Sequence, residues 1–271
     1  MSAEAAERLA TFRSRREEAA RSPQGFLSLV NTQWVTEPSS VWAAKGTWAP
    51  RSDGGSGLVV TATAEDGVIV DGALVDGEAV ARGKDDENPS SIVFSETSTG
   101  TVISGSEGYA LRVFYQHSED NQNFSHVDGY PYNAEMVFVA EWEEIPGGSL
   151  VGFEHLKDDG EARDEVVPGT IVLEHAGETY RLSAFKAGKA LQLVFADATS
   201  GIDTYSVGRF LFCAPNPDGT ITLDFNYAVL PPCAFSYQYN CPLPPANNRL
   251  PFAIEAGEKQ VMAINGLLHP E

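Results

Sequence analysis

The loop formed by residues 197–209, DATSGIDTYSVGR, holds the densest group of side chains that could take part in chemistry. Its carboxylates, hydroxyls and guanidinium lie between two apolar runs, and loops held by rigid strands often carry binding groups. Arg209 opens the second run, where its guanidinium could form paired hydrogen bonds to a ligand carboxylate or phosphate. Alternatively, Arg209 pairs with a nearby aspartate and only holds the loop in place. The candidate partners are Asp197, Asp203 and Asp224.

A second candidate segment runs from Asp224 to Asn248 and is rich in proline and aromatic side chains. A long loop of such fixed geometry is either functional or wrapped onto the body of the fold. Asp224 and Asn226 are two positions apart on a predicted strand, so their side chains share one face. They could form the floor of a pocket, or they could cap a turn at the strand end. Asn247, Asn248 and Arg249 either add hydrogen-bond donors or satisfy loop carbonyls.

Nucleophile and metal motifs are weak in both segments. Ser200 is not part of a GxSxG elbow, and neither segment holds a histidine that could activate a cysteine. Cys233 and Cys241 lack the ligand spacing of a zinc site, and a reduced buried pair is favoured over a disulfide in a cytoplasm. We therefore expect no metal and no cofactor. Asp197 and Asp224 are weak candidates for a general base, and no complete catalytic set can be assembled, so whether the protein is an enzyme stays open.

The elements that must position these side chains have the pattern of β-strands. Short runs rich in Val, Ile, Thr, Phe and Tyr recur between turn-forming residues. The turns at 174–178 and 216–219 predict antiparallel pairing, and no helical pattern alternates with the runs as a parallel sheet would require. The sequence predicts a mainly β fold, an antiparallel sandwich or barrel-like arrangement behind one short N-terminal helix. Predicted strands of the second half are 135–142, 149–156, 170–175, 179–186, 190–196, 208–213 and 220–226.

Details of this pattern give further expectations about the organisation of the chain. The sequence predicts a charged helix over residues 1–24 and a single β-rich module over residues 25–265. Residues 143–149, EEIPGGS, are either a boundary within that module or an ordinary hairpin loop. The polar stretch 116–134 is expected to be a surface loop with solvated histidines. The alternation of residues 179–186 slips near Ala184.

The charge of the chain excludes several classes of partner. The 271 residues carry a net charge of −20, which repels nucleic-acid backbones and anionic membrane surfaces. No run approaches the roughly 20 apolar residues that a membrane-spanning helix needs. The N-terminal stretch lacks the apolar centre of a secretory signal, so we expect a cytoplasmic protein. The oligomeric state is left open.

Several of these segments are similar to a bacterial and archaeal family, the domain-of-unknown-function family 1684. The likeness starts at GFLSLVNTQWV, includes SEGYALRVFY, and covers residues 10–262. It is sharpest in DATSGIDTYSVGRF, LDFN, PPCAF, CPLPPANNRL and IEAGEK. The resemblance implies one continuous module. It implies no particular activity, because the family is defined by sequence and its activity is not established. The polar positions that match the family pattern are Asp197, Thr199, Ser200, Tyr205, Arg209, Asp224, Asn226, Cys233, Cys241, Asn248, Glu255 and Glu258.

Two functional hypotheses follow. The first is a cytoplasmic β-protein with a pocket for a small anionic ligand between residues 197–209 and residues 224–248. Such a pocket could be hydrolytic, with Asp197 or Asp224 as the base. The predicted ligand-binding residues are Ser200, Tyr205, Arg209, Asp224, Asn226 and Asn248. The alternative is a non-enzymatic interaction or structural module, in which the proline- and aromatic-rich loop contacts a partner and Arg209 is buried in a salt bridge.

Overall fold

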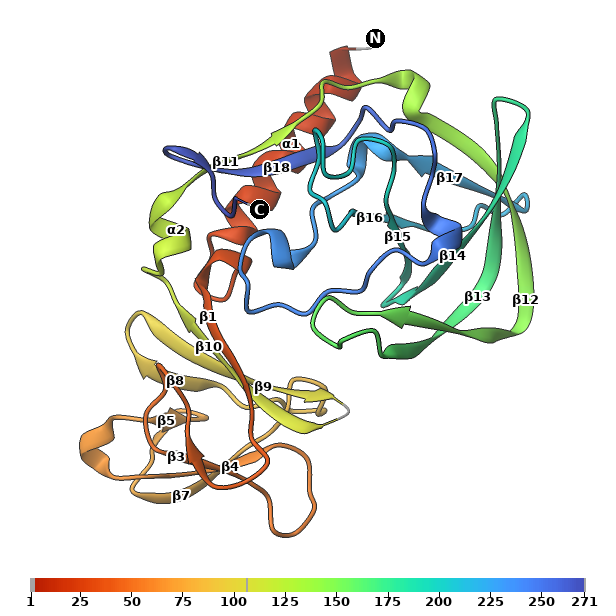
Figure 1. Cartoon of the computed structure of the whole chain (residues 1–271). Coiled ribbons are helices and arrows are strands. Elements are labelled where there is room, and N and C mark those ends of the chain that lie inside the picture. Colours follow the sequence, from red (N-terminus) through yellow and green to blue (C-terminus); the bar gives the residue numbers. More distant parts are fainter. Residues whose placement is uncertain (1–2, 106, 271) are drawn as a thin grey trace. The chain divides into compact units, whose positions relative to one another are not determined.

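A computed structural model describes residues 3–105 and 107–270 of the chain (Figure 1). By its internal contacts the chain divides into two compact units. Unit 1 combines Met1–Glu17 with Ser125–Glu271, and unit 2 is Glu18–Phe124. All the candidate site residues lie in the second stretch of unit 1. The structure confirms the predicted fold class, because its sheets are built from antiparallel strands and a helix stands at the N-terminus.

Unit 2 contains two sheets that enclose a core of their own. Trp48 is fully buried at its centre, with its ring edge-on to that of Phe94 at a centroid distance of 6.1 Å. The strands of the larger sheet, in spatial order, are β1 (Leu29–Trp34), β10 (Gly108–Tyr115), β9 (Ser98–Gly105), β8 (Ile92–Ser95), β5 (Ile69–Val70) and β6 (Ala73–Leu74). The smaller sheet has the order β2 (Ser39–Ser40), β3 (Thr47–Pro50), β4 (Leu58–Ala62) and β7 (Gly77–Ala81).

Unit 1 is built on a six-stranded antiparallel sheet that carries the candidate residues. Its spatial order is β16 (Arg209–Cys213), β15 (Ala190–Phe195), β14 (Glu178–Ala187), β13 (Ala162–His175), β12 (Val137–Glu154) and β17 (Thr220–Asp224). The two outer strands follow one another in the chain, and a bridge between Pro215 and Ile221 brings their ends together. The sheet is therefore curved in the manner of a barrel. A separate small sheet has the order β11 (Phe124–Gly129), β18 (Glu258–Ala263) and β19 (Gly266–Leu267).

The β13–β14 hairpin shows how local sequence sets this sheet. His175 pairs with Glu178, so only Ala176 and Gly177 form the turn. Both have positive φ, 52° and 84°, and a two-residue turn with positive φ at both positions matches the twist of the strands that it joins. The tight connection predicted at 174–178 is confirmed.

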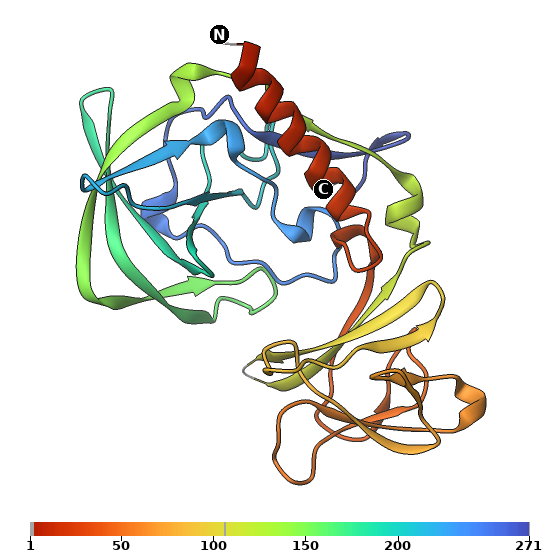
Figure 2. The same ribbon diagram turned by 180° about the vertical axis from the view of Figure 1, so that it is seen from behind.

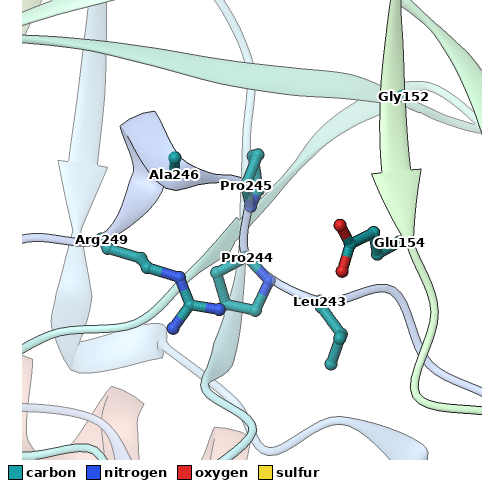
Figure 3. A pocket seen from close by; sticks show the side chains of 7 residues that line it. All are labelled: Gly152, Glu154, Leu243, Pro244, Pro245, Ala246 and Arg249. Carbon is teal, nitrogen blue, oxygen red and sulfur yellow. The ribbon is translucent and has the colours of Figure 1, made fainter. Parts of the chain in front are cut away.

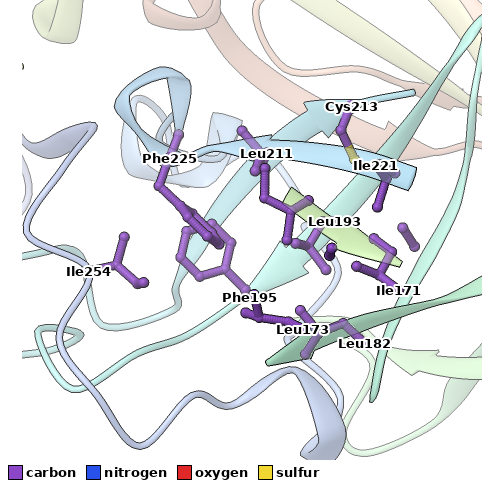
Figure 4. Packing of buried hydrophobic residues seen from close by; sticks show 14 of the residues in the cluster. Ile171, Leu173, Leu182, Leu193, Phe195, Leu211, Cys213, Ile221, Phe225 and Ile254 are labelled. Carbon is purple, nitrogen blue, oxygen red and sulfur yellow. The ribbon is translucent and has the colours of Figure 1, made fainter. Parts of the chain in front are cut away.

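The core of unit 1 lies inside the curved sheet (Figure 4). The rings of Phe195 and Phe225 meet edge-on at 5.0 Å, and both side chains are fully buried. Leu182, Leu193 and Ile221 approach them from three different strands. Alternate residues of each strand point inward, and the residues between them point to the outer face of the sheet.

Helices occupy the ends and the connections. Helix α1 (Ala3–Ala20) runs along unit 1 (Figure 2). Midway along the helix, the ring of Phe12 meets that of Tyr227 edge-on at a centroid distance of 5.0 Å. A single turn, α2 (Glu119–Asn123), precedes β11. The short 3-10 helices are η1 (Phe26–Ser28), η2 (Ala64–Asp66), η3 (Ala134–Met136), η4 (Phe225–Tyr227), η5 (Pro232–Ala234) and η6 (Ala246–Asn248).

Two local predictions are wrong. The stretch 116–134 is not a strandless loop, because it holds α2, β11 and the start of η3. The expected strands 135–142 and 149–156 form one strand, β12, whose register with β13 shifts between Glu144 and Ser149. Gly147 and Gly148 have positive φ, 81° and 73°. These turn-forming residues therefore lie in an irregularity of the strand, similar to a β-bulge, and do not end it. Residues 143–149 therefore lie inside a strand.

Candidate functional site

Arg209 lies at the first position of β16 and is completely enclosed. Its Nη2 donates to Asp197 Oδ2 at 2.7 Å and to the carbonyl of Ile254 at 2.9 Å. Its Nη1 donates to the carbonyls of Ala256 and Glu258, and the guanidinium lies 5.3 Å from the ring centroid of Phe195. The guanidinium therefore ties the 197–209 loop to the segment 254–258, and in this geometry it faces protein on all sides.

Asp197 is equally occupied by the protein. Its Oδ1 accepts hydrogen bonds from the backbone and hydroxyl of Thr199, at 2.9 and 2.7 Å, and from the backbone of Ile254 at 3.1 Å. Ser200 Oγ accepts from the amide of Asp197 at 3.1 Å. These contacts form a turn that is closed on itself, so the hydroxyls that the sequence offers for ligand binding are used to shape the loop.

Asp224, Asn226 and Asn248 also bond to backbone or to one another. Asp224 Oδ1 accepts from the backbone and side-chain nitrogens of Asn226, at 3.1 and 2.8 Å, and so caps η4 at the end of β17. Asn248 accepts from the amide of Ser183 and donates to the carbonyls of Ser183 and Val194. The structure thus places Asp197, Ser200 and Arg209 in one network, and Asp224 with Asn226 in another. Asn248 joins β14 to β15, apart from both.

Tyr205 lies elsewhere in the same loop. Its amide donates to the carbonyl of Lys259 at 3.0 Å, and its side chain forms a hydrogen bond with Cys233. It is half-buried. Tyr205 therefore connects the 197–209 loop to the proline-rich segment.

A pocket of about 310 Å³ is present on unit 1, at a different place from the Arg209 network (Figure 3). It lies between the end of β12 and the segment 243–249. Its volume is at the lower end of the range for small-molecule sites. The lining residues are Gly152, Glu154, Leu243, Pro244, Pro245, Ala246 and Arg249. The pocket therefore uses the second candidate segment but not the 197–209 loop.

Backbone hydrogen bonds fix both walls of this pocket. The amide of Leu243 donates to the carbonyl of Glu154 at 2.7 Å. At the other end, the amide of Leu250 donates to the carbonyl of Ala196 at 2.8 Å, and the amide of Ala196 donates to the carbonyl of Asn248 at 3.1 Å. Prolines between these two anchors restrict the backbone further, because the ring fixes φ. The wall is thus ordered before any ligand arrives.

Two charged side chains of opposite sign line the pocket. In Figure 3 the guanidinium of Arg249 and the carboxylate of Glu154 lie on opposite sides of Pro244. Both residues are exposed. Within residues 3–105 and 107–270, no carboxylate lies in ion-pair distance of Arg249 and no cation lies in ion-pair distance of Glu154. Both therefore keep their hydrogen-bonding capacity for a molecule in the pocket.

Arg249 and Glu154 were not among the predicted binding residues. The sequence offered Arg249 only as one of three donors after the prolines. Glu154 carried no usable signal, because 38 acidic residues make any single carboxylate uninformative. The pairing of residues 154–156 with residues 241–243 brings Glu154 to the pocket, and such a contact between distant segments is not visible in a local pattern.

An ion pair next to the pocket wall involves Asp158. Arg163 donates to both carboxylate oxygens of Asp158, at 2.6 and 2.9 Å, and Asn240 donates to Oδ1 at 2.6 Å. The hydrogen bonds from Arg163, with a contribution from Asn240, lower the pKa of Asp158. Burial and the nearby Arg163 charge lower the pKa of His155, which favours its neutral form. This cluster joins the turn after β12 to the proline-rich segment.

Two features are absent from the described part of the chain. No group of three or more His, Cys, Asp and Glu side chains there is arranged to hold a metal ion. Among the same residues, no helix has the length and apolar character needed to cross a membrane.

Comparisons with known proteins place the chain in a family. The family model described as "Protein of unknown function (DUF1684)" matches residues 122–259, a stretch that includes the Arg209 network and the pocket. An uncharacterized protein of Haloarcula marismortui, known from a solution NMR structure, is 30% identical, with a TM-score of 0.42. The match covers 51% of this chain and 77% of that chain. No match is found among the curated proteins. The family resemblance seen in the sequence is confirmed over residues 122–259, and the chain belongs to the DUF1684 family.

Proposed function

We propose that this protein binds a small molecule carrying a carboxylate in the pocket between β12 and the segment 243–249. The observation that carries the proposal is the exposed guanidinium of Arg249, which lines a pre-ordered pocket and forms no ion pair within the described residues. A guanidinium presents two parallel N–H groups to a carboxylate, and such bidentate pairs are among the stronger polar contacts. The proposal keeps the anionic ligand expected from the sequence and assigns Arg249 as its anchor.

Glu154 narrows the class of ligand. A purely anionic molecule would bring like charges together at the Glu154 side of the pocket, which is unfavourable. A ligand with a carboxylate near Arg249 and a cationic or hydrogen-bond-donating group near Glu154 satisfies both walls. The apolar surfaces of Leu243, Pro244 and Pro245 would contact the part between these groups. Amino acids and short peptides have this combination of groups.

The 197–209 loop does not favour the same role. Arg209 would have to give up its bond to Asp197 and three carbonyl contacts before it could bind a ligand. Removing one partner from a buried ion pair typically costs about 3–5 kcal/mol. Asp197 and Asp224 already accept several hydrogen bonds each, so hydrolysis is not part of the proposal.

A partner surface on the proline- and aromatic-rich loop is supported by only one of its rings. Tyr237 is 59% exposed, whereas Phe235 and Tyr239 are 1% and 8% exposed. Binding surfaces for proteins usually centre on several clustered anchor residues. The pocket therefore accounts for more of the geometry of this segment than a partner surface does.

Calorimetric titration with a panel of amino acids, dipeptides and simple carboxylates tests the proposal. We expect a molecule with both a carboxylate and an amine to bind, and Arg249→Ala to abolish its binding. Glu154→Gln should weaken binding of the amine-bearing molecule more than binding of its deaminated analogue. Arg8→Ala is the matched control, because it removes the same charge from a position on α1 that is 60% exposed and pairs with Glu4. Equal affinity of wild type and Arg249→Ala for every compound that binds would reject the site, and so would a panel without any binder.

A further inference from the structure

Cys233 and Cys241 lie next to each other although seven residues separate them. The amide of Cys233 donates to Cys241 Sγ at 3.2 Å, and the two side chains also form a hydrogen bond. Both are reduced thiols, and they are 1% and 3% exposed. The loop between them reaches the surface at Tyr237, which is 59% exposed. The backbone thus already holds the two sulfur atoms side by side.

The surroundings of this pair differ from those of the third cysteine. The hydrogen bond from Cys241, with a further one from Tyr205, lowers the pKa of Cys233 in spite of its burial. Burial alone raises the pKa of Cys213 to about 12. A thiolate is the nucleophile in thiol–disulfide exchange. Cys233 is therefore the better attacking group, and Cys213 is an internal comparison.

We propose that Cys233 and Cys241 form a thiol-oxidation site, at which a small-molecule disulfide converts the adjacent thiols into a reversible intramolecular disulfide. The thiolate of Cys233 attacks one sulfur of the reagent, forms a mixed disulfide and releases the first small thiolate. The Cys241 thiol then loses its proton, and its sulfur attacks the Cys233 sulfur and releases the second. The protein loses two protons and two electrons, and the reagent becomes two thiols.

The cysteine pair adjoins the wall of the proposed ligand pocket, so its oxidation would act on that wall. Cys241 is followed by Pro242 and by Leu243, which lines the pocket. The carbonyl of Cys241 accepts the amide of Leu156 at 3.0 Å, so the position of Cys241 is linked to the end of β12. Because the thiols are enclosed, the reagent reaches them through local opening of the loop. The first exchange step should therefore be slower than for a free thiol, and the second step, within the molecule, should be fast.

In the test, folded Cys213→Ser protein, whose remaining cysteines are Cys233 and Cys241, is treated with dithiodipyridine. The mass of the protein and the amount of released thiopyridone are measured. We expect two thiopyridones per chain and a product lighter by about 2 Da, the mass of two hydrogens. Dithiothreitol should restore the original mass. Wild-type protein should give the same intramolecular bond, with Cys213 unmodified.

Single-cysteine controls separate pairing from independent reactivity. In the same background, Cys233→Ser and Cys241→Ser should each end as a stable mixed disulfide with one thiopyridone released. If the folded Cys213→Ser protein ends with two thiopyridyl adducts, the sulfurs do not pair and the proposal is wrong. It is equally wrong if the folded protein does not react while its urea-unfolded form reacts completely. Both outcomes are read from Cys213→Ser protein itself, so they do not depend on whether the other variants fold.

Discussion

Two arginines of unit 1 show opposite ways of using the same side chain. Arg209 is 0% exposed, is paired with Asp197 and donates to three backbone carbonyls. Arg249 is exposed at a pocket and has no ion-pair partner among the described residues. The first guanidinium is surrounded by protein acceptors, and the second faces a space that a ligand can enter. The type of residue is therefore a poor guide to a site, and the distribution of acceptors around it is a better one.

The difference follows from what each loop requires. The backbone of residues 254–258 presents carbonyls toward the interior, and buried carbonyls need donors. Arg209 supplies these donors, and Asp197 compensates its charge. The backbone on either side of Arg249 is already hydrogen-bonded to Ala196, the residue that follows β15, so the Arg249 side chain is not needed to complete the fold.

Loss of the buried guanidinium should produce the largest effect. Arg209→Ala removes the guanidinium that donates to Asp197 Oδ2 and to three carbonyls. We expect a loss of about 3–5 kcal/mol in the free energy of unfolding, measured by urea denaturation. Arg249→Ala is the matched control, with an expected change within about 0.5 kcal/mol. Equal stability of the two variants would remove the distinction between the arginines.

A partly buried ion pair should give an intermediate effect. Arg16 on α1 donates to both oxygens of Glu258, at 2.7 and 3.0 Å, and Glu258 is only 2% exposed. Arg16→Ala should cost about 2 kcal/mol, because hydrogen bonds to charged groups contribute about 1.5–3 kcal/mol. The neighbouring exposed Arg15→Ala is the control and should leave the urea midpoint unchanged. A similar midpoint for both variants would mean that Glu258 does not depend on α1.

Acid should weaken the attachment of the pocket wall through Asp158. Its pKa is lowered in the fold, mainly by Arg163, so its charged form stabilises the native state. This contribution is fully present above the ordinary pKa of an aspartate, about 3.9, and is lost as the pH falls through the lower folded value. Asp158→Asn should therefore lower stability near neutral pH and flatten the acid limb of a stability–pH curve. Asp159→Asn, at the neighbouring exposed aspartate, is the matched control. Parallel curves for wild type and Asp158→Asn would contradict the assignment.

The smallest effect on stability is expected at the pocket itself. Arg249→Ala and Glu154→Gln should both melt within about 2 °C of the wild type, because exposed substitutions rarely change stability by more than 0.5 kcal/mol. Differential scanning calorimetry measures this directly. A large loss in either variant would show that the two charges support the fold, as Arg209 does.

Local sequence patterns predicted the parts of the fold that depend on near neighbours. The β13–β14 hairpin follows from its turn residues, and the strands β14 to β17 follow from alternating side chains. The slip expected near Ala184 is wrong: Leu182 and Ala184 are both fully buried, so the alternation continues. Phe185 instead packs on the other face, edge-on to Phe153 at 5.0 Å. The adjacent apolar residues Ala184 and Phe185 lie on opposite faces, and in the sequence they resembled a break in the alternation.

Long-range contacts were the part that the sequence could not provide. Strand β11 was missed because its polar residues have little strand character and its partner β18 is more than a hundred residues away. The candidate site also depends on contacts between segments that are distant in the sequence. The environment of Arg209 depends on carbonyls of residues 254–258, and the pocket depends on β12 meeting residues 241–243. Ligand binding by Ser200, Tyr205, Arg209, Asp224, Asn226 and Asn248 stays a prediction.

The most direct test of the contrast between the two arginines is to map a bound carboxylate on the molecule. Amide chemical shifts of the isotopically labelled protein would be followed while the best amine-bearing carboxylate of the panel is added. We predict shifts confined to residues 152–156 and 243–250, which disappear in Arg249→Ala and persist in Arg8→Ala. Shifts centred on residues 197–209 would contradict the account, because they would show that the buried Arg209 network opens to bind.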